Sequence, residues 1–84
     1  MTQEYETSEQ KLKVGDVVYL RKKTPFTPSK SNPTMGTMFE CSGVVIDADT
    51  LFGHVRVEWT NDKTNIYTHS DLIMAEHKEY NSIW

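Results

Sequence analysis

Cysteine and long apolar runs are both scarce in this chain of 84 residues, and each scarcity excludes a class of protein. The single cysteine, Cys41, cannot form an internal disulfide, which fits a reducing, intracellular setting. No apolar run approaches the ~18 residues that a membrane-spanning helix needs. The first residues, MTQEYETSEQ, are polar and acidic, which is the opposite of a signal or transit peptide. We therefore expect a soluble, cytoplasmic protein.

The residue patterns of enzymes, metal sites and cofactor sites are also missing. The three histidines, His54, His69 and His77, form no closely spaced pair of the kind that zinc sites use, either with one another or with Cys41. The four glycines lie too far apart to build a phosphate-binding loop. No motif pairs a nucleophile with a base or two carboxylates in a cleft. We expect a non-enzymatic protein with no cofactor and no metal.

Charge is unevenly distributed, although the net charge is only −3. Residues 1–10 carry three acids and no base, residues 11–38 carry six bases and one acid, and residues 39–84 carry eight acids and three bases. We expect a flexible acidic arm over residues 1–10, one domain over residues 11–77 and a C-terminal tail over residues 78–84. The overall acidity argues mildly against nonspecific nucleic-acid binding, but it leaves room for a local basic patch.

Alternating apolar and polar residues predict five short strands, with one helical turn at residues 70–72 before the last. The strands are expected over residues 17–22, 39–47, 54–60, 65–68 and 73–76. In the first strand Val18 and Leu20 share one face and are expected in the core, with Val14 helping at its rim. In the second strand Gly43 is expected to mark a bend or a bulge. The third strand alternates most clearly, since positions 55, 57 and 59 are apolar.

A long loop is expected between the first two strands. Residues 24–38 contain all three prolines together with several serine, threonine and asparagine residues, which favour turns over a helix. Loops of about 15 residues are uncommon in compact domains and are often functional. Phe26, Met35 and Met38 are apolar residues within this loop. They either fold back to cap an open end of the domain or form a flap that contacts a partner.

The segments KVGDVVYL, SGVVIDAD and HVRVEWTNDKTNIYTHSDL together resemble the Tudor-like and KOW-like branch of the SH3-like barrels. The resemblance covers residues 14–76, but the long proline-rich first loop departs from KOW-like proteins. It implies an all-β fold: a small five-stranded SH3-like barrel with a long first loop and one short 3-10 turn before the last strand. It also implies a closed wall of strands. Binding modules are common in this branch, although a full aromatic cage for a methylated side chain is not evident.

Aromatic residues are the candidate binding groups, because tryptophan and tyrosine give large contact areas with a polar tip. A half-buried place in the barrel wall is an equal alternative for Trp59, and Tyr67 is expected to be more exposed than buried. We expect a set of five aromatic residues, together with the long loop, to contact a partner protein. Its members are Tyr19, Phe26, Phe39, Trp59 and Tyr67.

A nucleic-acid-binding, KOW-like module is the alternative function. Its phosphate contacts would come from a basic stripe beside Tyr19, while the aromatic rings stack on bases. The stripe consists of Arg21, Lys22, Lys23 and Lys30. A third interpretation is that the acidic C-terminal half mimics DNA. An accessory or regulatory protein of a bacteriophage or mobile element would suit the small size and the lack of catalytic residues.

Overall fold

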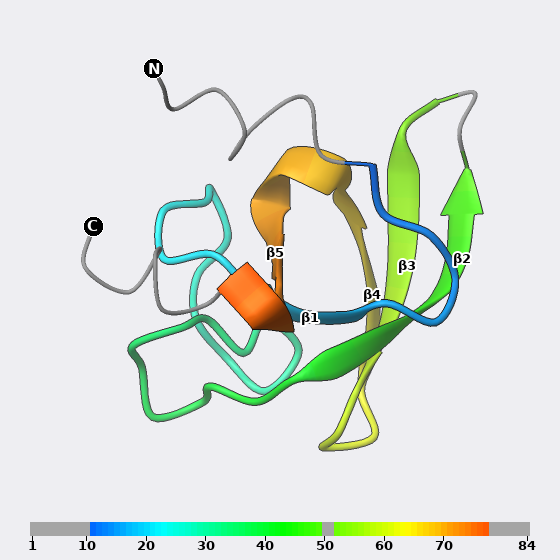
Figure 1. The fold of residues 1–84 in the computed structure, drawn as a ribbon. Coiled ribbons are helices and arrows are strands. Elements are labelled where there is room, and N and C mark those ends of the chain that lie inside the picture. The colour runs from blue at the N-terminus through cyan, green and yellow to red at the C-terminus, as the bar shows by residue number, and fades with distance from the viewer. Residues whose placement is uncertain (1–10, 50–51, 78–84) are drawn as a thin grey trace.

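Residues 11–49 and 52–77 are described by the computed structural model, and they form one antiparallel sheet of five strands (Figure 1). The expected arm and tail lie outside these residues. The described residues contain no α-helix, but two short 3-10 helices, η2 (His69–Asp71) and η3 (Ala75–His77), come before and after the last strand. The sheet order is β4-β3-β2-β1-β5. The strands are β1 (Val17–Leu20), β2 (Gly43–Asp49), β3 (His54–Trp59), β4 (Thr64–Thr68) and β5 (Leu72–Met74).

The predicted all-β class, the five strands, the long first loop and the 3-10 turn before the last strand are confirmed. The strand order is consistent with an SH3-like fold. The prediction of a closed wall is wrong, because within the described residues β4 and β5 are not paired with each other. Side chains occupy the free edge of β4: Asn65 Oδ1 accepts the amide of Ile66 at 2.9 Å, and Asp71 Oδ2 accepts that of Thr68 at 3.1 Å. These bonds satisfy backbone donors that a neighbouring strand would otherwise use.

The main core lies inside the curved sheet and follows the strand alternation. Val18 and Leu20 of β1 are fully buried, as predicted. On β3, buried and exposed residues alternate without exception, because every second side chain of a strand points to the same face. Val14 does not help at the rim and is 63% exposed, whereas Leu12 is 3% exposed and belongs to the core.

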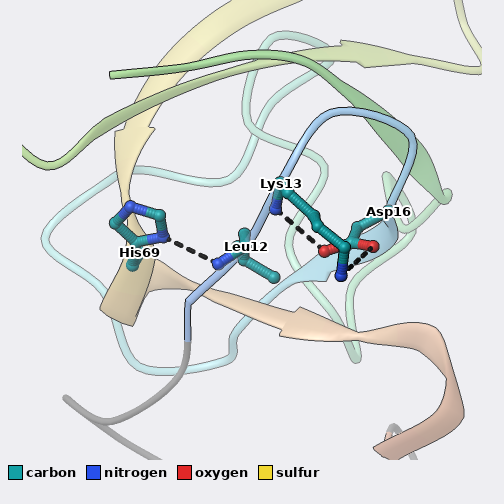
Figure 2. A network of polar contacts seen from close by, with 4 residues as sticks. All are labelled: Leu12, Lys13, Asp16 and His69. Atoms are coloured by element: carbon teal, nitrogen blue, oxygen red, sulfur yellow. Dashed lines mark hydrogen bonds and ion pairs between the residues drawn. The ribbon is translucent and has the colours of Figure 1, made fainter. Parts of the chain in front are cut away.

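Polar contacts hold the segment before β1 in the position that buries Leu12 (Figure 2). The amide of Leu12 donates to Nδ1 of His69 at 3.1 Å, which ties the segment to η2. Asp16 then accepts the amide of Lys13 at 2.9 Å and closes a turn. Gly15 lies in this turn with φ at 100°, a conformation that favours glycine. The turn carries Val14 outward, which explains why the expected rim position went to Leu12.

Gly43 was predicted to mark a bend or a bulge, but the bulge of β2 lies at Ile46. The β2–β3 register shifts between Val45 and Asp47, so that Ile46 is the extra residue. Gly43 instead allows close packing, because the ring of Trp59 lies directly against it. A Cβ atom at position 43 would come within 2.5 Å of Trp59 Cε3 and 2.6 Å of Val57 Cγ1. The glycine therefore makes room for the largest side chain of the core.

Candidate interaction surfaces

The long first loop, residues 21–42, is anchored to β1 at its middle. The amide of Met35 donates to the carbonyl of Leu20 at 2.9 Å, and Thr34 forms a parallel bridge with the same residue. Met35 is 2% exposed. It therefore folds back onto the domain, which is the first of the two alternatives for the apolar loop residues. In Figure 1 the loop runs from cyan to green along the side of the sheet that lies away from the β2–β3 turn.

A second anchor joins the loop to β3 and β4 through Tyr67. Its hydroxyl lies 2.8 Å from the carbonyl oxygen of Ser31 and 2.9 Å from Asn32 Oδ1, so it can donate its proton to either. The same hydroxyl accepts the indole N–H of Trp59 at 3.2 Å. Burial of the ring raises the pKa of the Tyr67 phenol, because an ionised phenolate is poorly solvated there.

Two asparagines complete this anchor. Asn61, in the β3–β4 turn, donates to the carbonyl of Lys30 at 2.8 Å. Asn65 of β4 donates to the carbonyl of Ser31 and to Asn32 Oδ1, both at 3.1 Å. The β3–β4 hairpin therefore holds residues 30–32 through side chains that the sequence places more than 30 positions away.

The predicted aromatic residues do not all reach one exposed patch. Tyr67 is 2% exposed, so the expectation that it is more exposed than buried is wrong. Trp59 is 1% exposed, so it is fully buried and not half-buried. The ring centroids of Trp59 and Tyr67 lie 5.7 Å apart, and Phe26 packs edge-on against Tyr67 at 5.1 Å. Phe26, Phe39 and Tyr19 are half-buried. Partner contact by these five residues stays a prediction.

The basic residues of the predicted stripe differ in exposure. Lys22, Lys23 and Lys30 are exposed, whereas Arg21 is half-buried and its amide donates to the carbonyl of Asp71 at 2.9 Å. The bond from Asn61 brings Lys30 beside the β3–β4 turn, which also carries Lys63. The positive charges of these exposed lysines suit a phosphate or a carboxylate of a partner.

A tight turn at residues 34–40 carries the most exposed apolar residue of the described chain. Thr37 donates through its hydroxyl to the carbonyl of Thr34 at 2.7 Å, and the amide of Gly36 donates to the Glu40 carboxylate at 2.9 Å. The amide of Glu40 donates in turn to the carbonyl of Thr37 at 3.1 Å. Met38 lies within this turn and is 91% exposed. We call residues 34–40 the Met38 turn.

A second surface, which the sequence reasoning missed, is the convex face of the sheet on β1 to β4. Its exposed apolar residues alternate with the buried ones, so strand alternation was the signal that could have found it. A hollow of about 160 Å³ lies on this face, lined by Asp47, His54, Arg56 and Ile66. We call it the outer sheet face and define it by Val17, Val44, Ile46, Asp47, His54, Arg56, Glu58, Thr64 and Ile66.

Metal-binding groups are not assembled within the described residues, where no three His, Cys, Asp or Glu side chains are placed to hold one ion. Cys41 is half-buried and packs against the core. None of the helical turns in the described part of the chain has the length and apolar character that crossing a membrane takes. No known protein family, curated protein or solved structure matches this chain.

Proposed function

We propose that this chain is a non-enzymatic binding module of the Tudor-like or KOW-like kind, which contacts a partner protein through its long first loop. The observation that carries the proposal is the Met38 turn, where a network of hydrogen bonds holds an apolar side chain 91% exposed. Covering a water-exposed methionine side chain with a partner removes apolar surface from water, which favours binding. Methionine also adapts to the shape of the surface that it meets, and it is frequent at protein-binding surfaces.

The anchored loop lowers the entropic cost of that contact. Residues 30–32 are tied to the β3–β4 hairpin, and Met35 is tied to β1. A loop held in one conformation loses little freedom when it binds, and more of the contact free energy remains as affinity. Exposed Lys22 and Lys23 follow β1 at the start of the same loop and suit an acidic partner.

A photocrosslinking amino acid at position 38 tests the proposal. It is expected to form a covalent adduct with another protein in a lysate of the source cells, because the side chain points into solvent from a fixed turn. The same crosslinker at position 14, where the residue is 63% exposed on another part of the molecule, is the matched control. Adducts at position 14 but not at position 38 would place the interface elsewhere.

Nucleic-acid binding is the second candidate, favoured by the exposure of Lys22, Lys23 and Lys30. If these lysines contact phosphates, the affinity for an oligonucleotide falls steeply with salt, and Lys22→Ala with Lys23→Ala flattens that slope. No binding at low salt would remove this candidate. The crosslinking and the salt titration therefore separate the two functions.

A further inference from the structure

The outer sheet face combines exposed apolar residues with charges of both signs. Val17, Val44, Ile46 and Ile66 lie on β1, β2 and β4, and each is between 39% and 45% exposed. Arg56 and Glu58 lie between them on β3. The ion pair between Lys13 and Asp16 does not involve this face, and none of the described carboxylates is within ion-pair distance of Arg56.

The strand register arranges these residues in two neighbouring rows. In the first row Val44 lies opposite Glu58, which lies opposite Thr64. In the second row Ile46 and Asp47 lie at the bulge opposite Arg56, which lies opposite Ile66. Each row crosses β2, β3 and β4 in the same order. On each of these three strands, the residue of the first row is therefore two or three sequence positions from the residue of the second row.

A two-fold axis between the rows would make this face complementary to itself. Such an axis runs across the strands and brings the first row of one copy onto the second row of the other. Val44 then meets the two bulge residues Ile46 and Asp47 of the second copy, Glu58 meets Arg56, and Thr64 meets Ile66. Val44 gains an apolar contact with Ile46, Ile66 meets the methyl-bearing Thr64, and Glu58 meets Arg56, while Asp47 lies opposite Arg56 of its own copy.

We propose that two copies of this chain associate through their outer sheet faces, with Arg56 of each copy paired with Glu58 of the other. The hollow of about 160 Å³ beside Arg56, which Asp47, His54 and Ile66 also line, leaves space for the incoming Glu58 side chain. Because each pair occurs twice across the axis, two ion pairs on β3 lie between the apolar contacts of β2 and those of β4. This inference concerns a different surface from the Met38 turn and does not depend on the proposed function.

Association through the strand edges is the main alternative for a small open sheet, and the structure disfavours it. The edge of β4 has two amides already bonded to Asn65 and Asp71. The other edge is formed by β5, which has only three residues. Occupied donors and short edge strands both prevent a second sheet from pairing there. The outer sheet face remains as the surface through which two sheets can meet.

Sedimentation equilibrium of the full-length chain tests the proposal over about 10 µM to about 1 mM protein, a range suited to weak association. The apparent mass is expected to rise with concentration from 9.7 kDa toward twice that value. Arg56→Glu and Glu58→Arg each place like charges against each other twice, so each is expected to weaken dimerisation about 10-fold or more. An equimolar mixture of the two variants restores both pairs and is expected to dimerise.

Matched controls separate this register from a general effect of charge. Lys11→Glu changes the net charge by the same two units as Arg56→Glu, at an exposed position outside this face, and is expected to leave the association unchanged. Arg56→Gln and Glu58→Gln each remove one charge but keep a polar side chain, and they are expected to give an intermediate weakening. Near-UV circular dichroism checks that each variant keeps its fold. A wild-type chain that stays monomeric throughout, or a mixture no more associated than its two components, would overturn the proposal.

Discussion

The backbone polar groups of the long first loop and those of the outer sheet face find their hydrogen-bond partners in different ways. In the loop, side chains from the β3–β4 hairpin satisfy backbone polar groups, since Asn61 and Asn65 donate to the carbonyls of Lys30 and Ser31. On the outer sheet face, hydrogen bonds between neighbouring strands satisfy the backbone polar groups. Strand alternation alone then directs the side chains of this face toward solvent. Exposure is therefore set by tertiary contacts in the loop and by local periodicity on the sheet.

Replacement of Trp59 tests how far both regions depend on the shared core. Trp59→Ala removes the largest buried side chain and the N–H that reaches Tyr67, and it leaves a cavity next to Gly43. We expect a loss of about 3–5 kcal/mol, which is enough to unfold a domain of this size. Urea denaturation followed by circular dichroism measures it. Glu58→Ala, on the opposite face of the same strand, is the control and should stay within about 0.5 kcal/mol.

Gly43 lies where the loop becomes β2, and an added methyl group there should affect both regions. Gly43→Ala places a Cβ 2.5 Å from Trp59 Cε3 and 3.0 Å from the backbone oxygen of Glu58, which cannot move without distorting β3. We expect a loss of about 1–3 kcal/mol from overpacking. The denaturation midpoint gives the value. An alanine at Gly53, where φ is 77° but no atom lies within 4 Å of the added Cβ, separates backbone strain from overpacking.

Tyr67→Phe should weaken the loop while it spares the sheet. The ring still packs, but the hydroxyl that meets Ser31, Asn32 and Trp59 is lost. We expect a cost of about 1–3 kcal/mol, because buried polar groups lose their partner. Amide hydrogen exchange should accelerate at residues 30–36 more than in β2. Equal acceleration in both regions would mean that the loop and the sheet open together.

Alkaline pH should act through the same hydroxyl. Burial raises the pKa of the Tyr67 phenol above its ordinary value of 10.0. Stability from this group is therefore complete below about pH 10 and falls as pH rises further, because the unfolded chain ionises first. The unfolding free energy of the wild type should drop faster than that of Tyr67→Phe between about pH 9 and pH 11. Parallel curves would show that Tyr67 ionises as easily in the folded chain.

The smallest effect on stability is expected on the outer sheet face. Ile66→Thr keeps a β-branched side chain at a position that is 44% exposed, so the free energy of unfolding should change by less than about 0.5 kcal/mol. Thermal denaturation at low concentration measures this change. A larger loss would mean that Ile66 packs against something in the monomer.

Strand alternation predicted the regular part of the fold and failed where side chains from distant segments meet. The burial of Val18 and Leu20 and the alternation on β3 were predicted correctly, because each depends on neighbours in sequence. The burial of Tyr67 was not, because its partners Ser31 and Asn32 lie more than 30 residues away. The bulge was also misplaced, since the glycine that suggested it instead makes room for Trp59.

The sequence by itself determined an all-β chain, five short strands, a long loop without a helix and a 3-10 turn before the last strand. These features depend on proline, on turn residues and on the two-residue period of strands, all of which act locally. Only the tertiary structure decided that the sheet stays open, that the loop is tied to β4 and that Met38 points outward. Those outcomes depend on which polar groups find partners across the molecule, and spacing along the chain does not specify such pairs.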